Sequence, residues 1–106
     1  MDPVNQYCDI VKKVIDYYAQ FKPSHGDIRL DTVFDDRDRR YALMQSGWDR
    51  GRRIRGNIIY VTIRDEKVWI EYDGIEAGIS DDLIALGIPE DRIVFAFLQD
   101  ISRTAS

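Results

Sequence analysis

Cysteine, histidine and proline are scarce in this sequence, and their scarcity excludes several classes of protein. The 106 residues contain one cysteine, one histidine and three prolines. Cys8 alone cannot form an intrachain disulfide or a cysteine zinc site, which fits a reducing, cytoplasmic setting. A catalytic pair of Cys8 and His25 would need a thiol on the apolar face of a helix to meet a loop histidine. Packing and loop roles explain both residues better.

Long apolar runs and an excess of positive charge are also missing. No apolar segment approaches the roughly 20 residues that span a bilayer. The segment around Asp2 and Asn5 lacks the charged-then-apolar order of a secretion signal. The 15 Lys and Arg residues are outnumbered by 19 Asp and Glu residues, which gives a net charge of -4. That balance argues against a general nucleic-acid coat protein but leaves room for a local basic patch.

The length and composition predict a single globular domain. A chain of 106 residues with a hydrophobic share of 44% can bury a core without disulfides or metals. We expect the domain to cover residues 1–98, and we expect residues 99–106 to form a polar C-terminal tail.

Hydrophobic periodicity predicts a helix at the start of the chain. Apolar residues recur every three or four positions, and Asp2-Pro3 suits a helix start. Lys22-Pro23 ends this predicted helix, because the residue before a proline avoids helical geometry. Residues 24–26 then form a loop. The periodic residues are Val4, Tyr7, Cys8, Val11, Val14, Ile15 and Tyr18.

Strand patterns fill the middle of the chain. The predicted strands cover residues 28–34, 41–45, 53–63 and 68–72, with turns at 35–39, 48–51 and 64–67. A short second helix at 80–86, capped by Ser80 and closed by Gly87, precedes a last strand at 93–97. Because short turns join consecutive strands, the strands pair antiparallel. The predicted fold class is α+β: a mostly antiparallel sheet of about five strands, with an N-terminal helix and a short second helix covering one face.

No catalytic or cofactor-binding group emerges from the residues. Asp31, Asp35 and Asp36 could hold a divalent cation in a metal-dependent nuclease. Their spacing fits no calcium loop, however, and neighbouring arginines would compete for the carboxylates, so a solvated charged turn is the better interpretation. The serines lack a nucleophile-elbow context, and the glycines at 47, 51 and 56 form no phosphate-binding pattern. We therefore predict no enzyme, no metal site and no cofactor.

The strongest local feature is a basic stretch between residues 49 and 55, where one aspartate and four arginines give a net charge of +3. In an extended strand, Arg53 and Arg55 point to one face and Arg52 to the other. One interpretation is a contact for an anion or partner, with Trp48 as an aromatic anchor. The alternative is a row of strand-edge charges that discourages sheet pairing and bonds to Asp35, Asp36 and Asp38. With Trp69 added as a core or interface residue, the candidate contact residues are Trp48, Arg50, Arg52, Arg53, Arg55 and Trp69.

Short motifs along the chain, in order, resemble those of one family. They begin with a helix tyrosine and a Lys-Pro loop, pass through four residue pairs, and end in three longer motifs. In this sequence they are Tyr7, Lys22-Pro23, Phe34-Asp35, Arg40-Tyr41, Gly47-Trp48, Arg52-Arg53, Lys67-Val68-Trp69-Ile70, Asp73-Gly74-Ile75-Glu76-Ala77-Gly78-Ile79 and Leu86-Gly87-Ile88-Pro89-Glu90-Asp91-Arg92-Ile93-Val94. Over residues 4–97 the chain is similar to XisI-like proteins, the fdxN element excision controlling factor family of cyanobacteria.

This resemblance implies a controlling factor that is needed for excision of a DNA element during heterocyst development and is distinct from the recombinase. It also implies a companion, the XisH-like protein, which looks nuclease-like in fold. The end of the chain departs from the family pattern of a histidine, a proline and a Lys-Arg stretch. Residues 98–104 read Leu-Gln-Asp-Ile-Ser-Arg-Thr instead, so no role of that stretch carries over.

Three functions remain open at this point. The first is a non-catalytic accessory factor for site-specific recombination that acts by contact with the XisH-like companion. The second is direct DNA binding through the arginines at 50–55, which would weaken steeply with salt. The third, with the least support, is the metal-dependent nuclease. We also expect a homodimer or higher homo-oligomer with Trp48 or Trp69 in the contact, because a small sheet covered on one side leaves apolar surface exposed.

Overall fold

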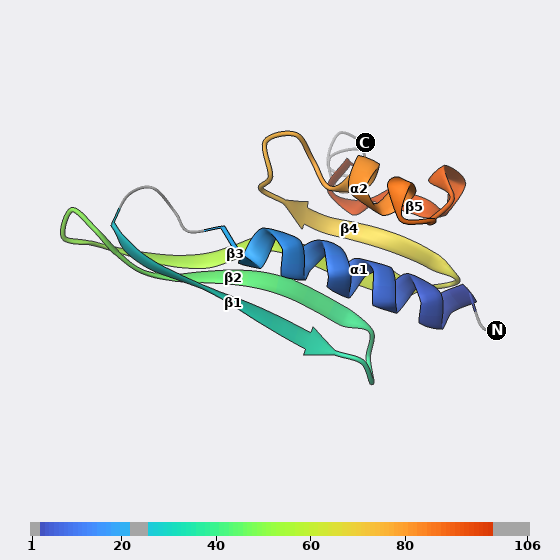
Figure 1. Cartoon of the computed structure of the whole chain (residues 1–106), viewed down its shortest axis with the longest axis horizontal. Helices are drawn as coiled ribbons and strands as arrows, with labels where there is room; N and C mark the ends of the chain where they lie inside the picture. The colour runs from blue at the N-terminus through green and yellow to red at the C-terminus, as the bar shows by residue number, and fades with distance from the viewer. Residues whose placement is uncertain (1–2, 22–25, 99–106) are drawn as a thin grey trace, which may run out of the picture.

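The domain consists of two layers, a five-stranded sheet and the helices that pack on it (Figure 1). The computed structural model describes residues 3–21 and 26–98. The predicted helix start at Asp2, the helix stop at Lys22-Pro23 and the polar tail at 99–106 lie outside these residues. Within the described ranges, no helix is both long enough and apolar enough to cross a membrane.

The first helix, α1, spans Pro3–Ala19 and buries one of its faces. The buried positions follow the three-to-four spacing of an amphipathic helix, as predicted. Cys8 is a buried free cysteine, so it acts as a small core residue. The buried residues of α1 are Val4, Tyr7, Cys8, Ile10, Val11, Val14 and Ile15.

The sheet consists of β1 (Asp27–Asp35), β2 (Arg40–Asp49), β3 (Arg52–Arg64), β4 (Lys67–Asp73) and β5 (Ile93–Phe95), in that spatial order. The first four strands pair antiparallel with their neighbours, whereas β5 pairs parallel with β4 after a crossover that contains α2. The predicted α+β class with a mostly antiparallel five-stranded sheet is therefore confirmed.

Two-residue turns close the hairpins at both ends of β3. Arg50-Gly51 joins β2 to β3 and Asp65-Glu66 joins β3 to β4, with φ between 53° and 77° at all four residues. Positive φ at both residues is the mark of a type I′ turn, whose twist suits antiparallel strands. The prediction that Trp48 and Asp49 lie in the turn is wrong, because β2 continues in register with β3 through residue 49.

The second helix, α2, covers Ser80–Ala85, and its start differs from the prediction. Ser80 is the first helical residue and makes no capping hydrogen bond, so the predicted serine cap is wrong. The Asp73 carboxylate organises the approach to α2 instead, because it accepts the backbone N–H groups of Ile75 at 3.0 Å and Ile79 at 2.9 Å. The loop before α2 is thereby tied to the end of β4.

The end of α2 follows the prediction at Gly87, which has a φ of +120°. Its N–H donates to the Ile84 carbonyl, and the N–H of Ile88 donates to the Leu83 carbonyl. These are the two bonds of a Schellman motif. A short 3₁₀ helix at Glu90–Arg92 then leads into β5, which is two residues shorter than predicted because residues 96–98 turn helical.

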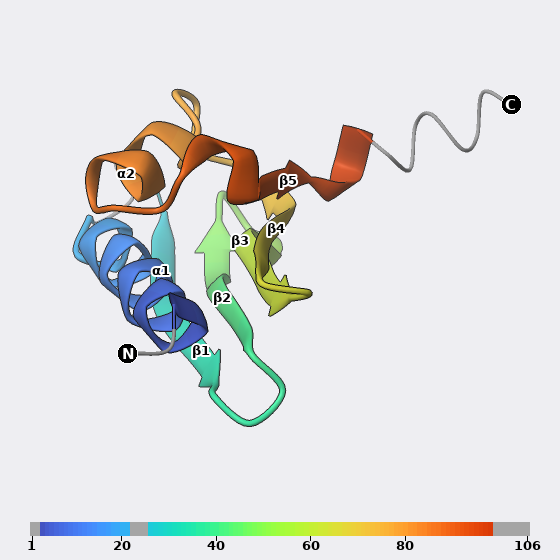
Figure 2. The same cartoon turned by 90° about the vertical axis from the view of Figure 1, so that its right-hand side faces the viewer.

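The core lies between α1 and the middle of the sheet, with α1 on one side of the strands (Figure 2). Alternating residues of β2, β3 and β4 point into it, and α2 closes one edge with Leu83. Burying each large aliphatic side chain stabilises the fold by about 1.5–3 kcal/mol, so stability concentrates beneath α1. The sheet residues of the core are Tyr41, Leu43, Ile59, Val61, Ile63, Val68 and Ile70.

The central strand is longer than the helix that packs on the sheet. The 13 residues of β3 extend about 40 Å, whereas the 17 residues of α1 extend about 25 Å. The β2–β3 hairpin and the start of β1 therefore project past the end of α1 (Figure 1). We call this projecting part, residues 27–29 and 46–55, the arm.

Candidate interaction surface

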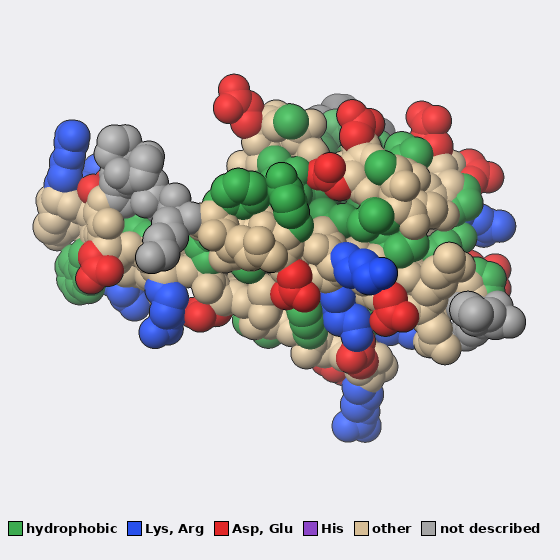
Figure 3. Space-filling view, viewed as in Figure 1, with side chains coloured by type: hydrophobic (Ala, Val, Ile, Leu, Met, Phe, Trp, Pro, Cys, Tyr) green, Lys and Arg blue, Asp and Glu red, His purple; other side chains and the backbone are tan. Residues whose placement is uncertain are grey.

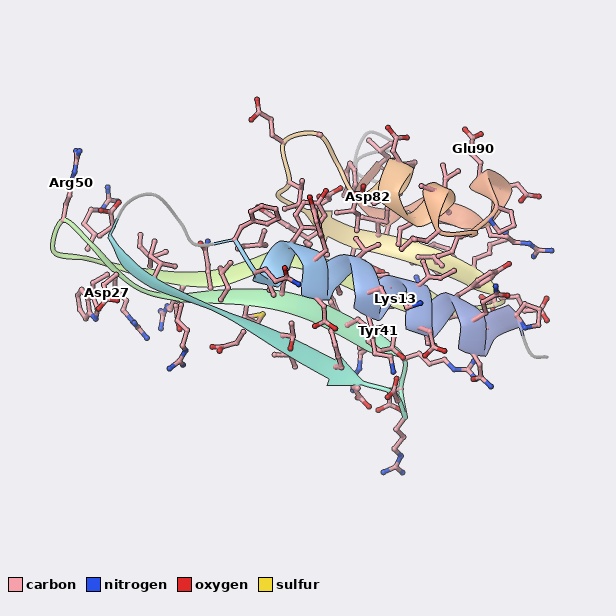
Figure 4. All side chains as sticks on the ribbon, viewed as in Figure 1. Lys13, Asp27, Tyr41, Arg50, Asp82 and Glu90 are labelled. Carbon is pink, nitrogen blue, oxygen red and sulfur yellow. The ribbon has the colours of Figure 1, made fainter. Side chains whose placement is uncertain are left out.

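The arm carries five of the six predicted contact residues. Trp48 pairs directly with Arg53, and Arg55 follows two positions on, so these three side chains share one face. Arg52 points to the opposite face. Arg50 lies in the turn at the tip and points away from the rest of the molecule (Figure 4).

Trp48 and Arg53 form an ordered pair on the surface. The guanidinium carbon of Arg53 lies 5.6 Å from the centroid of the Trp48 ring, and an Arg53 guanidinium N–H donates to the Gly47 carbonyl at 3.2 Å. An exposed cation–π contact of this kind contributes about 0.5–1 kcal/mol. Trp48 remains 54% exposed, so the pair fixes Arg53 while leaving much of the indole accessible.

The other three arginines of the arm have no intramolecular partner among the described residues. Arg50, Arg52 and Arg55 are all exposed, and none makes a hydrogen bond, ion pair or ring contact within that part of the chain. Pairing with the acidic turn, the alternative interpretation from the sequence, does not occur. The acidic turn, by which we mean residues 35–39, joins β1 to β2 at the opposite end of the sheet.

At that opposite end, the aspartates are held by the chain itself. Asp36 accepts hydrogen bonds from the Lys12 ammonium at 3.0 Å and from the Tyr41 hydroxyl at 2.7 Å. The Tyr41 hydroxyl and Lys12 lower the pKa of Asp36, and the bond to Asp36 raises the pKa of Lys12. Burial, together with contacts to Cys8 and Asp36, raises the pKa of Tyr41. This group ties α1 to the β1–β2 turn.

Asp35 organises the turn beside it. Its carboxylate accepts the backbone N–H groups of Arg37 and Asp38 and bonds to the Arg40 guanidinium at 3.3 Å. The Asp38 N–H, the Arg40 guanidinium and the Arg37 N–H all lower the pKa of Asp35. The acidic turn is therefore a self-contained structural unit.

Trp69 does not join the arm. It pairs with Thr62 in β3, nine positions from Arg53 and thus about 30 Å along the strand. Its indole N–H donates to the Arg64 carbonyl at 3.2 Å, and the Arg64 guanidinium carbon lies 4.1 Å from the ring centroid. Trp69 is half-buried, so most of its bonding capacity is used within the chain.

The carboxylates considered for a nuclease site are not gathered around a common point. Asp31 bonds to Arg29 at 3.0 Å, whereas Asp35 and Asp36 have the separate partners described above. In the described part of the chain, no three His, Cys, Asp or Glu side chains are placed to share a metal ion. The geometry gives the nuclease interpretation no support.

A second exposed surface, which was not predicted from the sequence, lies where the ends of α1 and α2 meet. Tyr17 lies in the last turn of α1 and Phe21 lies two residues beyond its end; they are 55% and 54% exposed, and Leu86 after α2 is 49% exposed. The Tyr17 and Phe21 rings pack edge to face with centroids 5.1 Å apart. Tyr17, Leu86 and Lys13 are among the residues that line an open pocket of about 250 Å³. We call Tyr17, Phe21 and Leu86 the aromatic patch; hydrophobic side chains are visible over α1 and α2 in Figure 3.

One hydrogen bond holds the two sides of this pocket together. The Tyr18 hydroxyl donates to the Asp82 carboxylate, which joins α1 to α2. That bond and partial burial raise the pKa of Tyr18 to about 12. The only signal of the patch in the sequence is the spacing of Tyr17 and Phe21, which lie four residues apart and outside the buried stripe of α1.

The comparisons with known proteins identify the family. The family model described as XisI protein matches residues 1–106. The crystal structure of a XisI-like protein from Anabaena variabilis ATCC 29413 is similar, with 27% identity over 87% of this chain and 84% of that chain and a TM-score of 0.80. The fdxN element excision controlling factor XisI of the same organism shows 28% identity over 91% and 93%, with a TM-score of 0.74. No curated protein matches the sequence. The family model matches all 106 residues of the chain, and both crystal structures have the same fold as the chain. The chain therefore belongs to the XisI family.

Proposed function

We propose that this protein is a non-catalytic accessory factor that controls the excision of a DNA element. The observation that carries the proposal is the similarity along 91% of the chain to a protein described as the fdxN element excision controlling factor XisI. Because the resemblance to this family implies an XisH-like companion, we further propose that the chain works by contact with that companion.

The aromatic patch is the surface that best fits a protein partner. Exposed apolar groups that gather on one surface mark interaction sites more often than scattered ones do. Rigid aromatic side chains next to a pocket are typical of the residues that dominate binding energy. The pocket volume of about 250 Å³ is below the range of about 300–1,000 Å³ that is usual for small-molecule sites. It suits a single side chain of a partner.

Binding of the purified companion tests this proposal. We expect a complex at micromolar concentration that weakens at least tenfold in a Tyr17→Ala/Phe21→Ala double variant, because truncating central aromatic residues commonly costs about 2 kcal/mol or more. A Val33→Ala/Tyr72→Ala variant is the matched control, since these side chains are 52% and 44% exposed and lie on other elements. Absence of any complex with the native chain would refute the companion contact.

The non-catalytic part of the proposal has its own test. The native chain, incubated alone with an excision substrate and Mg²⁺ or Mn²⁺, should leave the DNA uncut. Metal-dependent cleavage that persists through purification and disappears in an Asp31→Asn/Asp35→Asn variant would contradict it and would restore the nuclease interpretation.

The homo-oligomer expected from the sequence remains a prediction. The arm exposes Trp48, whereas Trp69 is largely engaged with Arg64, so Trp48 is the better candidate for the contact. Light scattering on the native chain and on Trp48→Ala measures the oligomeric state. A native monomer at high concentration would remove this part of the proposal.

A further inference from the structure

We propose that the arm binds the phosphate backbone of double-stranded DNA by placing its hairpin tip in a groove. This inference concerns a different surface from the aromatic patch and does not depend on the companion contact. It is carried by the shape of the arm, by the positions of its arginines and by the separation of charge along the chain.

Charge is strongly separated in this molecule. Residues 49–55 carry four arginines and one aspartate, or +3, so the other 99 residues carry -7 of the total of -4. Arginine side chains project from the arm, which also carries Asp27 and Asp49, whereas acidic side chains stand on the body above α1 beside Lys and Arg side chains (Figure 3). At 0.1 M ionic strength, exposed charges separated by more than about 10 Å are largely screened from each other, so an arm that projects from the body can attract phosphates while the acidic body does not. Contact with a polyanion is thereby favoured at the arm over the body.

The free arginines are the groups that a phosphate backbone requires. Arg50, Arg52 and Arg55 are exposed and have no partner among the described residues. A guanidinium forms paired hydrogen bonds to phosphate oxygens with good geometry. Arg53 is already oriented by Trp48 and by the Gly47 carbonyl, so less side-chain freedom is lost when it binds. Up to four phosphate contacts are available on one short segment.

The arrangement of these arginines favours a groove over a flat acidic surface. Arg52 and Arg53 point to opposite faces of the hairpin, and Arg50 lies at its tip. A flat protein surface would meet only one face, whereas a groove has a phosphate wall on each side. Beyond Trp48, where pairing with β1 ends, the arm narrows to a two-stranded tip that consists of residues 49–52. The major groove of B-DNA, about 12 Å wide, admits a two-stranded ribbon of this kind.

Titration of a 20-base-pair duplex at several salt concentrations tests this proposal. With four phosphate contacts, log K should fall with log salt at a slope of about -3.6. Affinity would then drop on the order of 10²-fold between 50 and 200 mM salt. In an Arg50→Gln/Arg52→Gln variant the slope should become shallower by about 2. Arg37→Gln/Arg39→Gln removes the same charge from the opposite end of the sheet and should leave the slope unchanged.

Four outcomes would overturn the proposal: no binding at 50 mM salt, equal losses in the two variants, displacement by polyglutamate at matched charge, or tighter binding to duplex RNA. Displacement by polyglutamate would assign the arm to an acidic protein instead. The deep, narrow major groove of RNA excludes such a ribbon, which is why RNA serves as the comparison. Companion binding should survive in Arg50→Gln/Arg52→Gln, so failure of this proposal and failure of the proposed function can be told apart.

Discussion

The two ends of the sheet differ in how their charged residues and tryptophans are bonded. At the acidic turn, Asp35 and Asp36 are satisfied by backbone groups, Arg40, Lys12 and Tyr41. At the arm, three arginines have no such partners among the described residues. The tryptophans show the same contrast, because Trp69 is half-buried and bonded through its indole, whereas Trp48 is mostly exposed.

This contrast separates side chains that maintain the fold from side chains that are available to a partner. Charged groups that bond within the chain fix a turn or join two elements, as Asp36 joins α1 to the sheet. Charged groups on a projecting hairpin, away from the core, stabilise little through exposed interactions. The exposed side chains of the arm, Trp48 and the arginines without partners, are therefore the positions where substitutions should affect binding more than folding.

The largest effect on stability is expected from a methyl group added at Gly47, where β1 and β2 approach each other closely at the base of the arm. A Cβ added at Gly47 would lie 1.9 Å from the Asp27 carbonyl oxygen. Gly47→Ala should therefore destabilise the protein by about 3 kcal/mol, as overpacking does. Gly56→Ala is the control, because nothing lies within 4 Å there and only backbone strain of about 1 kcal/mol remains. Urea unfolding measures both, and equal losses would contradict the close approach.

A smaller effect distinguishes the two tryptophans. Trp69→Ala should cost about 2 kcal/mol, because a half-buried ring, its hydrogen bond and its contact with Arg64 are all lost. Trp48→Ala should cost about 0.5 kcal/mol, since its ring is mostly exposed and its cation–π contact is weak. Thermal unfolding of the two variants gives the comparison. A larger loss at Trp48 would show that the arm is structural.

The hydrogen bonds of Asp36 in the acidic turn should make the stability of the protein depend on pH. The pKa of Asp36 is lowered in the folded state, so its contribution is present above its ordinary pKa of about 3.9. That contribution is lost as the pH falls through the lower, folded value. The effect should be smaller than the loss at Trp69, because Asp36 is exposed. Unfolding midpoints between pH 2 and 6 should depend less on pH in Asp36→Asn, and an unchanged pH profile would argue against the bonds to Lys12 and Tyr41.

The smallest expected effect is a gain in stability at the tip. Arg50 has a φ of 53° in a two-residue turn, where asparagine before glycine is favoured. Arg50→Asn should therefore stabilise the protein by about 0.5 kcal/mol while weakening DNA binding. Chemical unfolding and duplex titration on the same sample check both signs. A loss of stability would mean that the arginine itself supports the turn.

Much of the fold could be predicted from the sequence because its signals are local. The periodicity of residues 4–18, the short turns and Gly87 indicated the correct elements and the antiparallel order. The extent of β2 was missed because Asp49 and the glycines suggested a longer turn than the two-residue type I′ turn that forms. The cap of α2 was missed because its substitute, Asp73, lies at the end of another strand.

The candidate site was only partly accessible to sequence reasoning. The arginine cluster is contiguous and was therefore visible. That Arg50, Arg52 and Arg55 lack partners among the described residues depends on which turn lies at which end of the sheet, and this follows only from the register. The aromatic patch combines the end of α1 with the end of α2, which are more than 60 residues apart in the chain, so the local spacing of Tyr17 and Phe21 could indicate only one half of it.

The most direct test of the contrast between the two ends is the stability of an Arg50→Gln/Arg52→Gln/Arg55→Gln variant, measured by urea unfolding beside the native chain. If these arginines are free for a partner, the free energy of unfolding should change by less than about 0.5 kcal/mol, as at other surface sites without special contacts. A loss above about 1.5 kcal/mol would show that the arginines hold the hairpin together and would contradict the account.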